Sequence, residues 1–300
     1  MKSTRAGLYS VILGVLLVMA SPDSPAGVMD AGKPARVNVN QDPAAVTPKP
    51  TSIPFGLKPV SSAAALEVQQ FKWEEFGDDG GRLLQEKGSL FGALILLEQA
   101  RGPIEVRERI RVFGGSVDYD GSTWEGVPEE TDVGYLGVGL GMDGGYRVAF
   151  SKTVSAKLLA GLDSRLWQRD IKSREDVQGY KEFWMVLQGR VGGGLDVKWP
   201  QGIALAAEAC AALPLGTYES VDLYDGVDLR PGQKTTLGAE VRLTWKQLVA
   251  AAYVEGLEFD KSDSVSRRVA DDGMVYNLDL FQPKSEAHIA GLYIGYKKHF

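Results

Sequence analysis

The chain has 300 residues and a net charge of -6, and its acidic and basic residues are interspersed, so we expect no nucleic-acid partner. The hydrophobic fraction is 44%, and beyond residue 20 no apolar run approaches the roughly 18 residues of a membrane-spanning helix. The single cysteine, Cys210, excludes an internal disulfide. The 36 glycines and the absence of long helical patterns favour β structure.

Residues 1–26 predict a secretory signal peptide. Lys2 and Arg5 form the charged start, 8–20 form an apolar core, and Ala20 or Ala26 ends a small-residue cleavage site. The alternative, an uncleaved membrane anchor, is disfavoured because the apolar run is short. We therefore expect the mature chain to leave the cytoplasm.

Residues 27–65 predict a disordered, proline-rich linker in the periplasm. Six prolines are spread among Ala, Ser, Thr, Val and Gln, and no period could bury one face. The linker could also enter the interior of the domain that follows.

From residue 66 onward the chain reads as β-strands. The clearest strands set an apolar face against a polar one with a period of two, and they cover 104–116, 132–142, 153–170, 183–199, 203–215 and 235–245. In 132–142, for example, Leu136 and Val138 oppose Gly137 and Gly139.

Three further segments are less regular. In 66–76, Leu66 and Val68 are out of phase with Phe71 and Trp73, which predicts a bulge near Gln69. Both faces of 90–100 are apolar. In 248–259, Glu255 interrupts an apolar face made of Val249, Ala251, Tyr253, Leu257 and Phe259.

The connections between these strands alternate in length. Short links fall at 101–103, 200–202 and 246–247, with a somewhat longer one at 143–152. Long links rich in Asp, Glu, Gly and Ser fall at 77–89, 117–131, 171–181, 217–233 and 260–285. Within the last, 275–281 could extend the flanking hairpin. This alternation is typical of barrels with short turns at one end and long loops at the other.

The final strand, 289–300, carries a resemblance to a known class. Leu292, Ile294, Tyr296 and Phe300 share one face, and only Lys298 departs from the pattern. This ending is similar to the C-terminal strand of bacterial outer-membrane β-barrels. With the nine preceding segments, it implies that 66–300 is an all-β, antiparallel up-and-down transmembrane β-barrel of about ten strands, with long outer loops and short periplasmic turns.

The resemblance also implies a location and partners. We expect a monomer in the cell outer membrane, with both barrel termini in the periplasm, in contact with lipid and lipopolysaccharide. The barrel-assembly machinery would bind the C-terminal strand. The alternative is a soluble sandwich or lipocalin-like barrel, which is disfavoured because a dry core would not tolerate so many acids and bases.

In a barrel, the polar faces point into the lumen. We expect Glu258 there, and a charge network made of Glu105, Arg107, Arg109, Arg111, Lys157, Asp163, Arg165, Arg169, Arg190, Asp196, Lys198, Glu208, Glu240 and Arg242. Ten strands leave a narrow interior, so these charges predict a largely filled lumen and a structural or surface-interaction role. The alternative is a narrow porin-like channel that Arg107, Arg109 and Arg111 would bias toward anions.

The sequence predicts no catalytic residue, cofactor or metal site. The only histidines are His288 and His299, and no metal spacing, nucleophile elbow or phosphate loop is present. A second alternative is an omptin-like surface hydrolase, with His288 as general base beside aspartates of 260–285. The acidic outer loops could bind divalent cations that bridge lipopolysaccharide, or another cell.

Overall fold

The computed structural model describes residues 56–122, 128–174, 177–223, 226–271 and 274–300. The chain divides into two units, Met1–Gly56 and Leu57–Phe300. The predicted signal peptide and most of the predicted linker lie outside the described residues. The first strand begins at Lys58, so residues 58–65 belong to the barrel and not, as the sequence predicted, to the linker.

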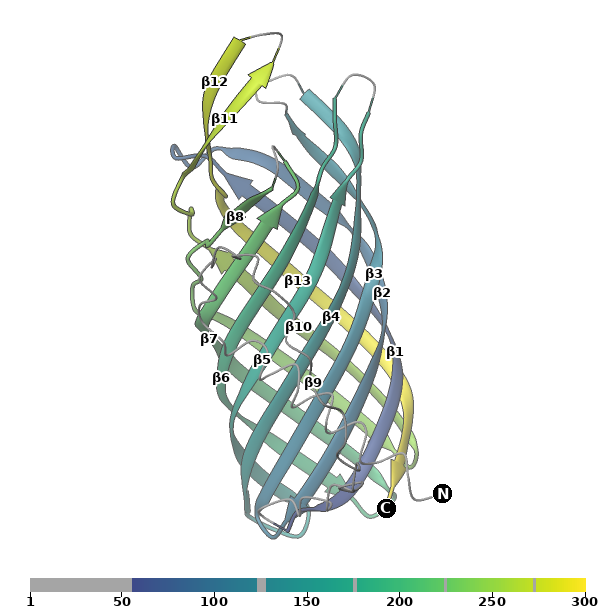
Figure 1. Ribbon diagram of the computed structural model, residues 1–300. Coiled ribbons are helices and arrows are strands. Elements are labelled where there is room, and N and C mark those ends of the chain that lie inside the picture. The colour runs from purple at the N-terminus through teal and green to yellow at the C-terminus, as the bar shows by residue number, and fades with distance from the viewer. Residues whose placement is uncertain (1–55, 123–127, 175–176, 224–225, 272–273) are drawn as a thin grey trace, which may run out of the picture. The chain divides into compact units, whose positions relative to one another are not determined.

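Residues 58–299 form a closed antiparallel barrel of ten strands (Figure 1). Its strands are β1 (Lys58–Phe76), β2 (Arg82–Arg101), β3 (Ile104–Ser122), β4 (Pro128–Ala149), β5 (Val154–Ile171), β6 (Lys181–Trp199), β7 (Ile203–Val221), β9 (Thr236–Trp245), β10 (Leu248–Phe259) and β13 (Lys284–His299). Consecutive strands pair around the wall, and β1 closes it against β13 in continuous register from Ser61–His299 to Phe76–Lys284. The predicted fold class and strand number are confirmed.

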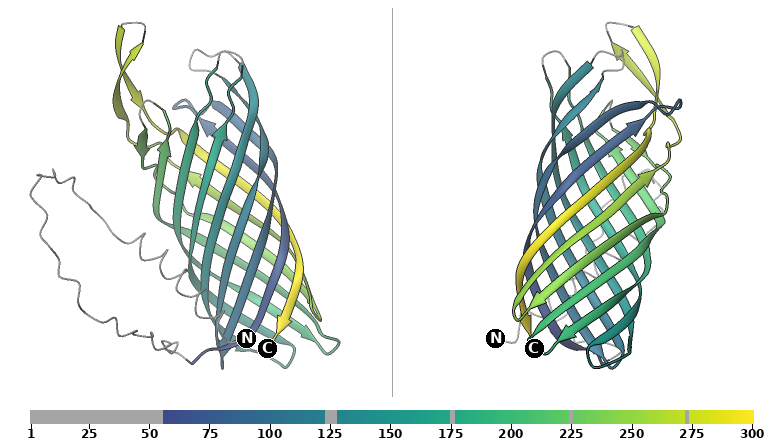
Figure 2. Two further views of the ribbon diagram at one scale, coloured as in Figure 1. Left: turned by 45° about the vertical axis from the view of Figure 1, so that its right-hand side comes forward. Right: turned by 180° about the vertical axis from the view of Figure 1, so that it is seen from behind.

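Three short strands lie outside this wall. β8 (Val227–Leu229) pairs with the end of β7, and β11 (Val265–Asp271) pairs with β12 (Met274–Leu280) as a separate hairpin. The hairpin rises beyond the rim of the barrel (Figure 2). It contains the segment 275–281 that was predicted to extend the flanking strands, but it forms a sheet of its own. In the described part of the chain, no helix is long and apolar enough to cross a membrane.

The two ends of the barrel differ in their connections (Figure 1). Tight turns join the strands at one end, where Gly102, Gly202 and Lys246 adopt the left-handed backbone conformation, with φ of 60°, 79° and 54°. The link predicted at 143–152 is also short there, because β4 extends to Ala149 and β5 starts at Val154. The longer loops gather at the opposite end. We call these the turn end and the loop end.

The outer wall carries an apolar belt. On β1, Leu66 (73% exposed) is followed on the same face by Val68 and then by Gln70, Lys72 and Glu74. The paired strand β13 changes in the same way, from Leu292 to His288 and Glu286, at the same level of the barrel. On these two paired strands the belt therefore gives way to polar outward residues at the same level.

Two strands differ from their predicted orientation. Phe71 and Trp73 point inward with no bulge near Gln69, because β1 keeps one register along its pairing with β13. On β10 the orientation is reversed: Val249, Tyr253 and Phe259 are buried in the interior, and Glu258 is on the outer side. Both faces of β10 are apolar, so alternation alone could not orient it.

Candidate functional site

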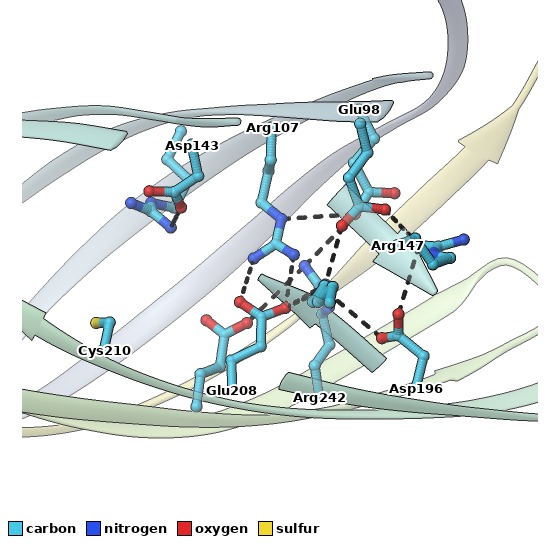
Figure 3. Close-up of polar contacts among 12 residues, drawn as sticks. Glu98, Arg107, Asp143, Arg147, Asp196, Glu208, Cys210 and Arg242 are labelled. Atoms are coloured by element: carbon cyan, nitrogen blue, oxygen red, sulfur yellow. Dashed lines mark hydrogen bonds and ion pairs between the residues drawn. The ribbon is translucent and has the colours of Figure 1, made fainter. Parts of the chain in front are cut away.

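Toward the turn end, charged side chains pair across the lumen (Figure 3). The Arg107 guanidinium donates two hydrogen bonds to Glu208, of 2.8 and 2.6 Å. Lys157 Nζ lies 2.6 Å from Glu208 and Arg242 Nη2 lies 3.4 Å from it, so three cations surround one carboxylate. Bidentate pairs of this kind hold both partners in fixed positions.

The network continues around the wall. Arg147 bonds Glu105 and lies 3.4 Å from Asp196, while Lys297 of β13 donates to Glu98 at 2.7 Å. In the middle of the barrel, Arg109 bonds Asp143 at 2.6 Å, Arg111 lies 2.9 Å from Glu67, and Arg165 bonds Glu255. The lumen between these pairs holds cavities of about 70 and 230 Å³.

Most of the predicted lumen residues belong to this network. The structure gives an ion pair to each of them except Lys198, which is exposed at the turn end. The network also contains residues that the sequence did not predict, namely Glu67, Glu98, Asp143, Arg147, Glu255 and Lys297. Cys210 accepts a hydrogen bond from the lumen residue Arg190 at 3.2 Å.

Nearer the loop end, a layer of aromatic side chains fills the lumen. Trp184 stacks on Trp167 with ring centroids 5.5 Å apart, and it contacts Trp73 and Phe259 at 5.2 Å each. All four are at most 5% exposed. The outward neighbours of this layer are Lys72, Glu74 and Glu258 on β1 and β10. On β5 and β6 they are Leu166, Phe183 and Met185, so the layer lies where the apolar belt gives way to polar residues on one side of the barrel.

Arg169 of β5 lies above this layer and is almost completely buried. Its guanidinium donates to Glu75 at 3.1 Å, to Glu182 at 2.7 Å and to Glu86. Trp73 and Trp184 donate their indole N–H groups to Glu75 and Glu182 at 2.9 and 3.0 Å. Arg169 therefore already donates hydrogen bonds to three carboxylates.

The loop end contains a cavity of about 530 Å³. We call it the mouth cavity; its lining includes Glu75, Phe76, Leu84, Tyr119, Tyr180, Glu182, Glu219, Val221, Val227, Leu229, Lys261, Leu280 and Phe281. Val221, Val227, Leu229 and Leu280 form a small apolar cluster of their own, which packs against Tyr180. Residues of β1 and β2 thus line the same chamber as residues of β6, β7 and β12.

Glu219 of β7 is the exceptional residue in this lining. It is 0% exposed, and neither carboxylate oxygen has a hydrogen-bond partner among the described residues. Burial raises the pKa of Glu219 well above its ordinary value, and the neighbouring Glu182 and Glu75 raise it further. Burial likewise raises the pKa of Tyr119 to about 12, so this phenol stays neutral.

Sequence reasoning missed Glu219 because of a bulge. Gln188 of β6 pairs with Pro214 but Leu187 pairs with Gly216, so Leu215 is an extra residue in β7. The bulge reverses the alternation and turns Glu219 inward. A strand predicted to end at 215 carries no signal for it.

Neither histidine lines this chamber. His288 is 64% exposed on the outer wall, with Glu286 at 3.9 Å, and His299 lies at the turn end opposite Ser61. Among the described residues, the carboxylate paired with His288 is Glu286 and not one of the loop aspartates that the hydrolase alternative required. Among the described residues, no group of three His, Cys, Asp or Glu side chains could hold a metal ion.

Comparison with known proteins shows which class of proteins shares this fold. No family model matches the chain, and no curated protein sequence matches it. Among solved structures, it is similar to the outer membrane protease OmpT from Escherichia coli, with a TM-score of 0.55 and 11% identity over 81% of this chain and 97% of that one. The chain thus has the fold of the bacterial outer-membrane β-barrel proteins.

Two further structures show weaker likeness. The transport unit of the autotransporter AIDA-I from Escherichia coli matches with a TM-score of 0.41 and 10% identity, over 78% of this chain and 90% of that one. The toluene transporter TbuX from Ralstonia pickettii matches with a TM-score of 0.38 and 11% identity, over 81% and 90%. Neither bears on the function of this chain.

Proposed function

We propose that the protein is a non-conducting barrel of the outer membrane that acts at its loop end, as a structural and surface-interaction protein rather than a channel or an enzyme. The apolar belt would contact lipid, the turn end would face the periplasm, and the loops would face outward beside lipopolysaccharide. Short turns on the inner side and long loops on the outer side are the rule for such barrels. We expect a monomer, assembled through its C-terminal strand.

The observation that carries this proposal is the filled lumen. Arg107, Arg109 and Arg111, the candidate lining of a channel, are at most 14% exposed, and each is paired with a carboxylate. The aromatic layer around Trp184 then occupies the lumen on the loop side. A mobile anion would have to displace a carboxylate from each arginine in turn, which favours a static interior.

Planar bilayer recording tests the absence of conduction. The purified protein should show no stable unitary currents, and neither should the variant that combines Arg107→Gln, Arg109→Gln and Arg111→Gln. Currents through the native protein that fall in the triple variant would establish the channel alternative instead.

The membrane assignment has a separate test. A folded barrel resists detergent at room temperature, so the unheated protein should migrate differently on a gel from the boiled protein. Identical migration of a sample whose β structure had been verified by circular dichroism would contradict the membrane-barrel assignment.

A further inference from the structure

We propose that the mouth cavity binds a small organic cation, an ammonium group carried on an apolar or aromatic body. This inference deepens the proposed function, and rests on it in one respect: the ligand is held at the loop end because the lumen below is filled.

The charge balance of the chamber supports a cationic ligand. Glu75, Glu182 and Glu219 all line the cavity. Arg169 donates hydrogen bonds to two of these carboxylates, Glu75 and Glu182, and also to Glu86. Lys261, which also lines the cavity, lies 2.8 Å from Asp78. Carboxylates therefore outnumber the cations available to them.

The geometry singles out Glu219 as the group that meets the ligand. Buried carboxylates are normally paired, because burying an unpaired one costs free energy. Glu75 and Glu182 each accept hydrogen bonds from Arg169 and from a tryptophan. Glu219 has no such donor among the described residues. An ammonium group in the cavity would supply the missing donor, and its positive charge would favour the ionised form of Glu219.

The walls of the cavity favour an organic ligand. Leu84, Val221, Val227, Leu229 and Leu280 are all at most 9% exposed and line the chamber together. Tyr119 and Tyr180 add aromatic rings, which attract cations over their faces. A volume of about 530 Å³ falls within the range typical of small-molecule sites. Apolar walls with one carboxylate match an amphipathic amine.

Calorimetric titration of the full-length protein in detergent tests the site. The probe is 2-phenylethylammonium, and the matched probes are 2-phenylethanol, which lacks the charge, and 3-phenylpropionate, which reverses it. We expect the ammonium probe to bind at least tenfold more tightly than the alcohol and the carboxylate not to bind. Equal affinity for the ammonium probe and the alcohol would overturn the proposal.

Variants then locate the binding. Glu219→Gln keeps the shape of the side chain and should weaken ammonium binding at least tenfold. Glu74→Gln removes a carboxylate from the outer wall of β1, beside Lys72, and should leave binding unchanged. Unchanged binding in Glu219→Gln, or an equal loss in Glu74→Gln, would contradict the assignment.

A second variant covers the case in which Glu219→Gln fails to fold. Leu83 borders the cavity and is 46% exposed, so Leu83→Lys adds a cation at the rim without disturbing buried packing. It should weaken ammonium binding and leave heat modifiability intact; unaltered binding would contradict the site. If the protein conducts no current and does not bind 2-phenylethylammonium, only this inference is overturned. If the protein conducts ions, the proposed function is overturned.

Discussion

At the scale of single residues, the protein keeps a carboxylate where it lowers stability. Glu219 is fully buried beside Trp184 of the paired strand and lacks a hydrogen-bond donor among the described residues. An unsatisfied buried polar group costs about 1–3 kcal/mol, and more when it is charged. A buried polar group without a partner calls for a specific explanation, and a ligand that supplies the missing donor is one such explanation.

Replacing this carboxylate should stabilise the empty protein. Because burial raises the pKa of Glu219 above its ordinary value of 4.5, the folded state holds the proton more tightly than the unfolded state. The contribution of Glu219 to the free energy of unfolding is therefore most favourable below pH 4.5 and is lost as the pH rises through the raised pKa. We expect Glu219→Gln to be more stable than the native protein by about 1–3 kcal/mol at pH 8, and equal to it at pH 4.

Thermal unfolding in detergent at the two pH values measures this difference. Glu74→Gln serves as the control, because Glu74 lies on the outer wall. A Glu219→Gln variant less stable than the native protein at pH 8 would mean that Glu219 already has a cationic partner.

At the scale of strands, small residues on the inner face make room for large ones opposite. Gly137, Gly139 and Gly141 of β4 face the lumen, as the sequence predicted for the first two. A Cβ added at Gly137 would lie 2.8 Å from both Phe113 Cε1 and Trp167 Cβ, and one at Gly141 would lie 2.8 Å from Arg109 Nη2. The glycine row of β4 is thus the complement of the large side chains of β3 and β5.

This complementarity predicts different costs at neighbouring positions. Gly137→Ala should destabilise the barrel by about 1–3 kcal/mol, because Phe113 and Trp167 are packed and cannot retreat freely. Gly139→Ala is the matched control: its Cβ would lie 3.6 Å from Arg111 Cβ, an ordinary contact. Urea unfolding followed by tryptophan fluorescence compares the two, and equal midpoints would refute the packing argument.

The orientation of some strands could be predicted from the sequence, and that of others could not. Alternation oriented β4, β6 and β9 because their two faces differ, as Leu136 and Val138 differ from Gly137 and Gly139. It failed for β1 because the lumen near the loop end is lined by aromatic rings, so Phe71 and Trp73 face inward. It failed for β10 because both of its faces are apolar, with Val249 facing inward near the turn end and Phe259 near the loop end. An apolar residue marks the lipid face only where the lumen is polar.

At the scale of the whole molecule, the lumen has two chemically different parts. Toward the turn end it is a network of ion pairs, which the sequence predicted through its alternating charges. Toward the loop end it is an aromatic layer below the mouth cavity. The cavity depends on β7, β8, β12 and loop residues that meet only when the barrel closes, so no local pattern could predict it.

Contact between the apolar belt and lipid can be tested directly. Leu66 is 73% exposed on the outer face of β1, where a substitution in a water-soluble protein would cost little. If the belt contacts lipid, Leu66→Arg must bring a charge into the bilayer and should destabilise the barrel by roughly 2–4 kcal/mol. Gln70→Arg is the matched control, because Gln70 lies on the same face of the same strand beyond the belt. Urea titrations of folding into lipid vesicles should show the loss for Leu66→Arg alone, and equal stability of the two variants would mean that the belt does not face lipid.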